Sequence, residues 1–274
     1  MPSQTVSAVT RADLPMASAL AIGLEVIDSV PSTNAELAAR ERRARQPHFT
    51  SLVTLHQTAG KGRLGRTWSA PPGSSLAVST VIRPKAIPLD RLGILTLLGG
   101  LAAREAVATQ LPGSVVTVKW PNDVLIAGRK VCGVLAEVVP QTGAIVLGVG
   151  INTAMTQEQL PVPTATSIAI ESPDPVPAAE LADRVLTEFL AALAGLVARF
   201  EAARGDIDRA GLRDQLEAAC GTIGAQVSVQ QPDGSKFTGR ALGIGADGSL
   251  LVASGGSADP AAILAGDVTH LRYQ

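Results

Sequence analysis

Residues 57–68 read Gln-Thr-Ala-Gly-Lys-Gly-Arg-Leu-Gly-Arg-Thr-Trp and follow an apolar run that begins at Ser51. The apolar run predicts a buried strand, and the glycines predict a loop whose backbone can approach a ligand closely. Three cations, Lys61, Arg63 and Arg66, alternate with the glycines, and such cations hold phosphates through charge-assisted hydrogen bonds. The alternative is a solvated basic turn, but crowded like charges favour a loop that orders on an anion.

The glycines of this loop also fit the dinucleotide-binding pattern G-x-G-x-x-G. That pattern requires a helix to begin in the loop, so that the helix N-terminus can hold a pyrophosphate. Residues 66–73 read Arg-Thr-Trp-Ser-Ala-Pro-Pro-Gly, and the two prolines prevent a long helix from starting there. The sequence therefore argues against a nicotinamide- or flavin-binding fold.

A second segment, residues 118–123, reads Val-Lys-Trp-Pro-Asn-Asp at the end of another expected strand. Alone it would be an ordinary turn, because Pro and Asn-Asp are common turn residues. However, the sequence has only five lysines and two tryptophans, and this segment holds one of each. A hairpin places Lys130 near Asn122 and Asp123, so we predict that the two segments share one site. The alternative for Lys130 is a solvent-facing position at the start of the hairpin.

The composition narrows the class of protein. The chain has 274 residues, of which 46% are hydrophobic and 17% charged, which is typical of a globular protein. A formal net charge of -1 gives no global attraction to nucleic acid or membrane. Cys132 and Cys220 are far apart and the three histidines form no cluster, so we expect reduced thiols and no protein-bound zinc. No signal pattern and no apolar run of about 20 residues is evident, so we expect a cytoplasmic protein.

Periodicity and turn residues predict an α+β fold with two domains. We expect a flexible tail over residues 1–20, a catalytic domain over 21–219 and a small β-barrel over 220–274. The expected helices are 33–45, 91–110, 178–203 and 208–219. The expected strands are 24–27, 51–57, 75–82, 115–119, 131–139 and 144–151, then 226–230, 236–244, 250–253 and 268–271. Thr33 and Glu36 have capping-box spacing at the start of the first helix.

Five ordered segments resemble the biotin protein ligase family: residues 32–34, 57–68, 119–123, 129–133 and 148–152. Residues 266–268, Gly-Asp-Val, are similar to the end of the family's C-terminal SH3-like barrel. The resemblance implies a mixed or antiparallel sheet packed with helices, of the class II aminoacyl-tRNA-synthetase type. It implies a ligase that forms biotinyl-5′-AMP from biotin and ATP with Mg²⁺. The biotin is then transferred to a lysine of the biotin carboxyl carrier protein domain of a biotin-dependent carboxylase.

The resemblance also implies roles for individual residues. For the biotin site it implies Ser32, Thr33, Asn34, Gln57, Lys61, Gly62, Arg63 and Lys130. For the ATP and adenylate site it implies Arg63, Arg66, Trp68, Asn122, Lys130 and Asn152. For catalysis it implies Lys130, Arg63 and Asp123, with Asp123 also the candidate ligand of magnesium.

Two departures from the family pattern stand out. Lys61 occupies a position where the family usually has arginine. Few residues precede the first expected strand, too few for a helix-turn-helix, so we expect the short type without sequence-specific DNA binding or membrane association. A homodimer remains open.

Two other functions are alternatives to this one. A lipoate ligase or octanoyl transferase would share the fold, but it would need an elongated apolar slot. A nucleic-acid-binding regulator built on the C-terminal barrel would have only three cations there, Lys236, Arg240 and Arg272. These are too few for a face that binds nucleic acid.

Overall fold

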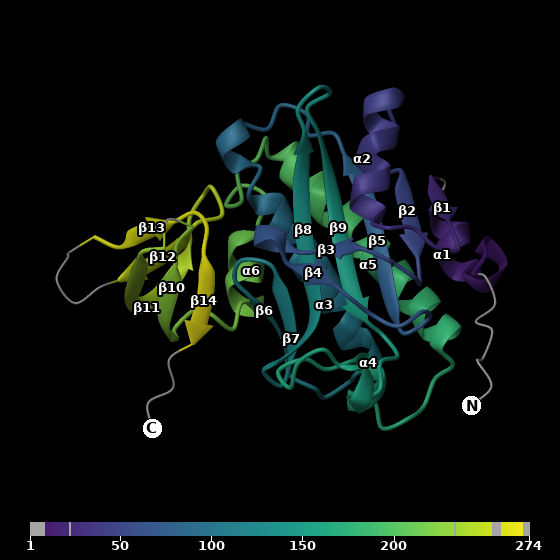
Figure 1. Ribbon diagram of the computed structural model, residues 1–274. Helices are drawn as coiled ribbons and strands as arrows, with labels where there is room; N and C mark the ends of the chain where they lie inside the picture. The colour runs from purple at the N-terminus through teal and green to yellow at the C-terminus, as the bar shows by residue number, and fades with distance from the viewer. Residues whose placement is uncertain (1–8, 22, 233, 254–258, 271–274) are drawn as a thin grey trace.

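The computed structural model describes residues 9–21, 23–232, 234–253 and 259–270. Its largest element is a seven-stranded sheet (Figure 1). In spatial order the strands are β1 (Leu24–Val26), β2 (Ser51–Thr54), β5 (Ser75–Ile82), β9 (Ala144–Asn152), β8 (Arg129–Val139), β7 (Asp123–Ile126) and β6 (Val116–Lys119). β1 and β2 are parallel and all other neighbours are antiparallel, which confirms the predicted mixed sheet.

Helices cover the two faces of this sheet unequally. The longer helices α3 (Ile94–Gln110) and α5 (Ala178–Ala202) pack on one face, and α2 (Thr33–Arg43) packs on part of the other. The shorter helices are α1 (Pro15–Leu20), α4 (Ile168–Glu171) and α6 (Arg213–Ala219), with 3₁₀ turns η1 (Arg11–Asp13), η2 (Arg63–Gly65), η3 (Leu89–Arg91) and η4 (Gln157–Gln159). All eight residues of β5 are buried, since this central strand is covered on both faces.

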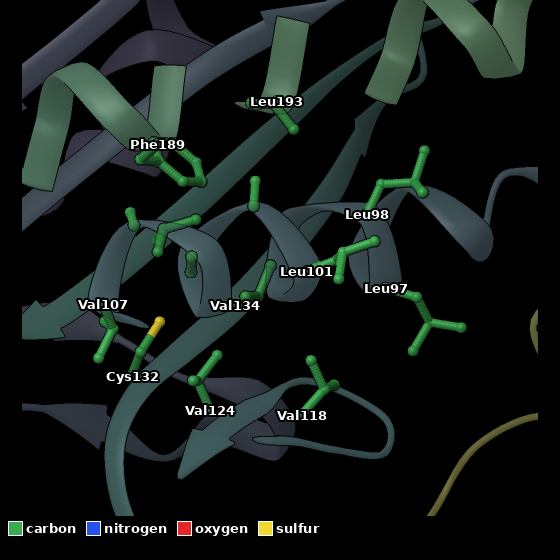
Figure 2. Packing of buried hydrophobic residues seen from close by; sticks show 14 of the residues in the cluster. Leu97, Leu98, Leu101, Val107, Val118, Val124, Cys132, Val134, Phe189 and Leu193 are labelled. Atoms are coloured by element: carbon green, nitrogen blue, oxygen red, sulfur yellow. The ribbon is translucent and has the colours of Figure 1, made fainter. Parts of the chain in front are cut away.

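The main core lies between α3, α5 and the sheet. Figure 2 shows α3 between Phe189 and Leu193 of α5 and side chains of the sheet such as Val124 and Val134. The helical segment Leu89–Gln110 is long and apolar enough to cross a membrane by length and composition, although no membrane-spanning run was expected there. Because 61% of its most apolar stretch is buried inside the protein, it is best described as a core helix.

The opposite face of the sheet is only partly covered. Leu37 and Ala38 of α2 pack on Leu52, Val81 and neighbouring residues at one end. Beyond α2, a hairpin of β3 (Gly60–Lys61) and β4 (Thr67–Trp68) lies over β8 and β9 (Figure 1). This leaves a part of the sheet where polar side chains and glycines, in place of core residues, face the hairpin.

A second sheet follows α6. Its five antiparallel strands, in spatial order, are β13 (Ala261–Ile263), β12 (Leu250–Ala253), β11 (Lys236–Ile244), β10 (Gln226–Gln230) and β14 (Asp267–His270). Trp120, which is 1% exposed, joins the two sheets because its Nε1 donates a hydrogen bond of 3.0 Å to the Gly248 carbonyl oxygen. Trp120 is therefore a structural residue of the junction.

The structure corrects four local expectations. Residues 15–20, expected within a flexible tail, form α1, and the Asp183 carboxylate accepts hydrogen bonds of 2.9 Å from the backbone of Met16 and of Ala17. Residues 1–8 of that expected tail lie outside the described residues. Ser32, not Thr33, is the N-cap of α2, because its hydroxyl accepts from the Ala35 amide.

The third correction concerns residues 123–126, which form β7, a strand not expected from the sequence. The fourth is β13, likewise unexpected, at the edge of the second sheet. Both strands have four residues or fewer, and such short apolar runs give too little periodicity to be recognised.

Candidate active site

A cavity of about 330 Å³ lies between the uncovered part of the large sheet, the β3–β4 hairpin and strand β14. Nearly every site residue predicted from the sequence lines this cavity. These residues are Ser32, Thr33, Asn34, Gln57, Lys61, Gly62, Arg63, Arg66, Trp68, Asn122, Asp123 and Lys130. Residues that are up to about 100 positions apart in the chain thus meet in one place.

Two glycines form the floor beneath Trp68. Gly133 of β8 and Gly150 of β9 are directly opposite each other in the sheet. A Cβ atom on Gly150 would lie 2.6 Å from Trp68 Cε2, and one on Gly133 would lie 3.3 Å from Trp68 Cζ3. The absence of side chains at these two positions is therefore what lets the indole ring rest on the sheet. Trp68 Nε1 is buried, and within the described residues it has no hydrogen-bond partner.

One end of the cavity carries uncharged hydrogen-bonding groups. Gln57 Oε1 accepts a hydrogen bond of 2.8 Å from the Thr33 backbone amide and lies 3.2 Å from Thr33 Oγ1. Ser79 Oγ lies 2.7 Å from Thr33 Oγ1 and 2.6 Å from Asn34 Oδ1. Because Thr33 is the first residue of α2 and not its cap, its hydroxyl is available to this cluster. A Cβ on Gly148 would lie 2.1 Å from Asn34 Oδ1, so this glycine makes room for the asparagine.

The other end carries charged groups. Lys130 Nζ and Asp123 Oδ1 form an ion pair of 2.6 Å, and Lys130 Nζ lies 5.9 Å from the centre of the Trp68 ring. Arg63 Nη1 donates a hydrogen bond of 2.9 Å to Asn122 Oδ1. Asn122 is itself held, because its Nδ2 donates to the Val134 carbonyl oxygen at 3.0 Å. The hairpin predicted from the sequence thus does bring Lys130 to Asp123, beside Asn122.

Positive charge predominates around this end. The cavity is lined by five cations, Lys61, Arg63, Arg66, Lys119 and Lys130, and by two carboxylates, Asp123 and Asp267. Burial lowers the pKa of Arg63 and of Lys119 from their ordinary values, and Asp123 partly opposes the shift in both. Partly desolvated cations of this kind are stabilised when an anion binds, because it offsets the cost of burying their charge.

The second sheet completes the cavity wall. Asp267, Val268 and Thr269 of β14 line the cavity, and Asp267 forms an ion pair with Arg66 of the hairpin. Both side chains are partly exposed, so the pair contributes little stability by itself. It does connect the hairpin to the second sheet, and the cavity is therefore built from both parts of the chain.

One predicted site residue lies elsewhere, and several lining residues were given no role. Asn152 is 5% exposed, is not among the lining residues, and its Nδ2 donates to the Thr166 carbonyl oxygen at 2.9 Å. Its role in binding ATP stays a prediction. Lys119, Asp267 and Thr269 line the cavity without a role from the sequence. Lys119 had a usable signal as a scarce lysine within residues 118–123, and Asp267 belongs to the segment 266–268 that resembles the end of the family's barrel.

Comparison with known proteins places this geometry in context. Residues 26–152 match the model of the biotin/lipoate A/B protein ligase family. The chain is 35% identical to the biotin–[acetyl-CoA-carboxylase] ligase of Mycobacterium tuberculosis over 254 residues, covering 91% of this chain and 89% of that protein. It is 30% identical to the bifunctional ligase/repressor BirA of Bacillus spizizenii over 237 residues, covering 83% of this chain and 67% of that protein.

A solved structure agrees with these sequence matches. The biotin protein ligase from Aquifex aeolicus in complex with biotin and ATP superimposes with a TM-score of 0.71 at 26% identity. The match covers 92% of this chain and 100% of that one. The chain therefore belongs to the biotin/lipoate A/B protein ligase family, among its biotin protein ligases.

Proposed function

We propose that this protein is an ATP-dependent biotin protein ligase, which forms biotinyl-5′-AMP and transfers biotin to a lysine of a carboxylase carrier domain. The observation that carries the proposal is a single cavity with an uncharged polar end and a cationic end on one glycine floor. Biotin has the same division, with a neutral ureido ring at one end and a carboxylate at the other. The names of the relatives support the acceptor, since two are ligases for acetyl-CoA carboxylase.

The charged end supplies what the first half-reaction needs. The biotin carboxylate must attack the α-phosphate of ATP, so two anions have to be brought together by fixed positive charge. Lys130 is proposed to contact both the biotin carboxylate and the α-phosphate. Its side chain lines the cavity, and Asp123 Oδ1 holds its ammonium group at 2.6 Å. Arg63, held by Asn122, and Arg66 are proposed to bind the phosphates and the adenylate.

The second half-reaction needs protection from water until the acceptor lysine arrives. Its amine attacks the carbonyl carbon of the mixed anhydride, and AMP leaves with the electron pair of the broken C–O bond. Trp68 and the hairpin form one wall of the cavity, and they are proposed to shield the intermediate from water. Asp123 is proposed to help orient the incoming lysine while it holds Lys130.

Magnesium fits the site only as a partner of ATP. Among the described residues, no group of three His, Cys, Asp or Glu could hold a metal ion. Magnesium is usually held by one or two carboxylates together with substrate phosphates, and Asp123 can serve as such a carboxylate. When bound, the ion would neutralise negative charge on the phosphates. We also propose a cytoplasmic protein that uses a carrier domain as its partner and does not bind specific DNA; a homodimer is compatible with these proposals.

The test follows labelled biotin into a purified carrier domain, with ATP present and with lipoate as competitor. We expect incorporation that needs ATP and that lipoate does not inhibit. The Lys130→Ala variant should release no pyrophosphate from ATP and biotin, because the cation at the reacting centre is gone. Pyrophosphate release within tenfold of the wild type would refute the role of Lys130, and inhibition of labelling by lipoate would refute the choice of biotin.

A further inference from the structure

A glutamate outside the cavity lining is connected to the uncharged end of the cavity. Glu137 of β8 accepts a hydrogen bond of 2.9 Å at its Oε2 from Asn34 Nδ2. The second hydrogen on Asn34 Nδ2 is donated to the Leu135 carbonyl oxygen at 3.1 Å. An ionised carboxylate and a backbone carbonyl oxygen can only accept, so Glu137 and Leu135 together determine that the Nδ2 end of the Asn34 amide faces β8.

The orientation of the Asn34 amide determines that Ser79 is a hydrogen-bond donor. With Nδ2 directed to β8, Asn34 Oδ1 faces Ser79 Oγ at 2.6 Å. An amide oxygen carries no hydrogen, so the Ser79 hydroxyl must be the donor of this bond. Ser79 is fully buried, and water therefore does not compete for its proton.

Because of Ser79 and Gln57, the Thr33 hydroxyl can act toward a ligand only as a hydrogen-bond acceptor. The two oxygens within reach of the Thr33 hydroxyl are Gln57 Oε1 at 3.2 Å and Ser79 Oγ at 2.7 Å. Its single proton is used inside the protein in either case, so Thr33 Oγ1 offers a lone pair to the cavity. Gln57 Oε1 is occupied by the Thr33 amide at 2.8 Å, which leaves Gln57 Nε2 as a donor.

We propose that Glu137 is a positioning residue for ligand recognition: through Asn34 and Ser79 it makes Thr33 an acceptor beside the Gln57 donor. This rests on the proposed function, since a ureido ring needs an acceptor for its N–H and a donor for its C=O. The alkyl end of a fatty acid offers neither group, so the same pattern selects against a plain alkyl chain at this end of the cavity. Glu137 does not line this cavity but a neighbouring hollow beside the β3–β4 hairpin, and its connection to Thr33 runs through Asn34 and Ser79.

The experiment measures KM for biotin, KM for ATP and kcat in the full chain. In Glu137→Ala we expect KM for biotin to rise about tenfold, as one to two misdirected hydrogen bonds would produce. KM for ATP and kcat at saturating biotin should stay within about threefold. Glu137→Gln should restore KM for biotin, because its amide oxygen can still accept from Asn34. Ser79→Ala should match Glu137→Ala.

The matched control is Ser51→Ala. Ser51 is buried in the same sheet and its Oγ lies 2.9 Å from Thr80 Oγ1, but it does not line the cavity. Its KM for biotin should not change, and urea unfolding should show whether each variant is folded. If Glu137→Ala does not fold, Ser79→Ala decides.

Three results would overturn the proposal: an unchanged KM for biotin in both Glu137→Ala and Ser79→Ala, a Glu137→Gln variant as impaired as Glu137→Ala, or equal losses for biotin and ATP. Failure of the proposed function would look different, because then the wild type would not label a carrier domain at all.

Discussion

The glycine floor beneath Trp68 makes a quantitative prediction for Gly150→Ala. The backbone of Gly150 is that of an ordinary strand, so alanine meets no conformational penalty there, and Gly→Ala at a compatible site stabilises by about 0.4–1 kcal/mol. The added Cβ, however, would lie 2.6 Å from Trp68 Cε2 and 2.9 Å from Nε1. One of the two must move, and the two-stranded hairpin that carries Trp68 is less firmly held than the central strand β9.

The size of the effect follows from the cost of overpacking, which is about 1–3 kcal/mol for an inserted methyl group. If this cost falls on docking of the hairpin, the equilibrium constant for docking decreases by about 5- to 150-fold. We expect kcat/KM for adenylate formation to fall by up to that factor, whereas the free energy of unfolding changes little. Gly133→Ala should give a smaller decrease, because its Cβ would lie 3.3 Å from Trp68 Cζ3 and 3.4 Å from Lys130 Nζ.

Tryptophan fluorescence distinguishes hairpin displacement from general destabilisation. The chain has two tryptophans and Trp120 is fully enclosed at the junction of the sheets, so a change in quenching by iodide reports Trp68. Gly150→Ala should increase quenching, and Gly195→Ala, where a Cβ would meet nothing within 4 Å, should not. A Gly150→Ala protein with shielded tryptophans and wild-type adenylation would refute the role of the floor.

Three further predictions concern other parts of the chain. Lys61→Arg should slow release of biotinyl-adenylate about fivefold in stopped-flow measurements, because arginine can hold a phosphate or carboxylate through two parallel bonds; equal release rates would mean that Lys61, an exposed residue, does not touch the intermediate. Asp183→Ala should lower the free energy of unfolding in urea by about 1–2 kcal/mol, since the amides of Met16 and Ala17 lose their acceptor; an unchanged midpoint would show that α1 contributes nothing. Burial lowers the pKa of His48 from its ordinary value, so the unfolded chain binds the proton more readily and stability should fall as pH drops below about 6.5; the same pH slope in His48→Asn would assign that fall to other groups.

The sequence predicted the long elements of the fold well because their periodicity is strong. The buried run of β5 and the apolar stripe of α5 were both expected. Helix α1 could not be expected, since it has six residues and depends on hydrogen bonds to Asp183, 166 or more positions away. Strand β7 was not expected because residues 121–123 are turn-forming types. In the structure the turn ends at Asp123, which pairs with Lys119 as the first residue of β7.

The sequence predicted only those parts of the site that lie in short local motifs. Lys130 and Asp123 could be brought together from the sequence because a local hairpin joins them. Ser79, Glu137 and Asp267 could not be placed at the site from the sequence. Pairing of strands in the large sheet brings Ser79 and Glu137 to Asn34, and the second sheet brings Asp267 to Arg66. A serine in an apolar strand and a glutamate near a strand end carry no signal of their own.

Strand β14, which forms one wall of the cavity, is synthesised after the other elements that line it. A ribosome makes the floor, the hairpin and α2 first, and it makes Asp267 to Thr269 after all of them. A nascent chain can thus bury the core of the large sheet while its cavity still lacks one wall and Arg66 still lacks its partner. The lining of the cavity is therefore complete only after β14 has been synthesised.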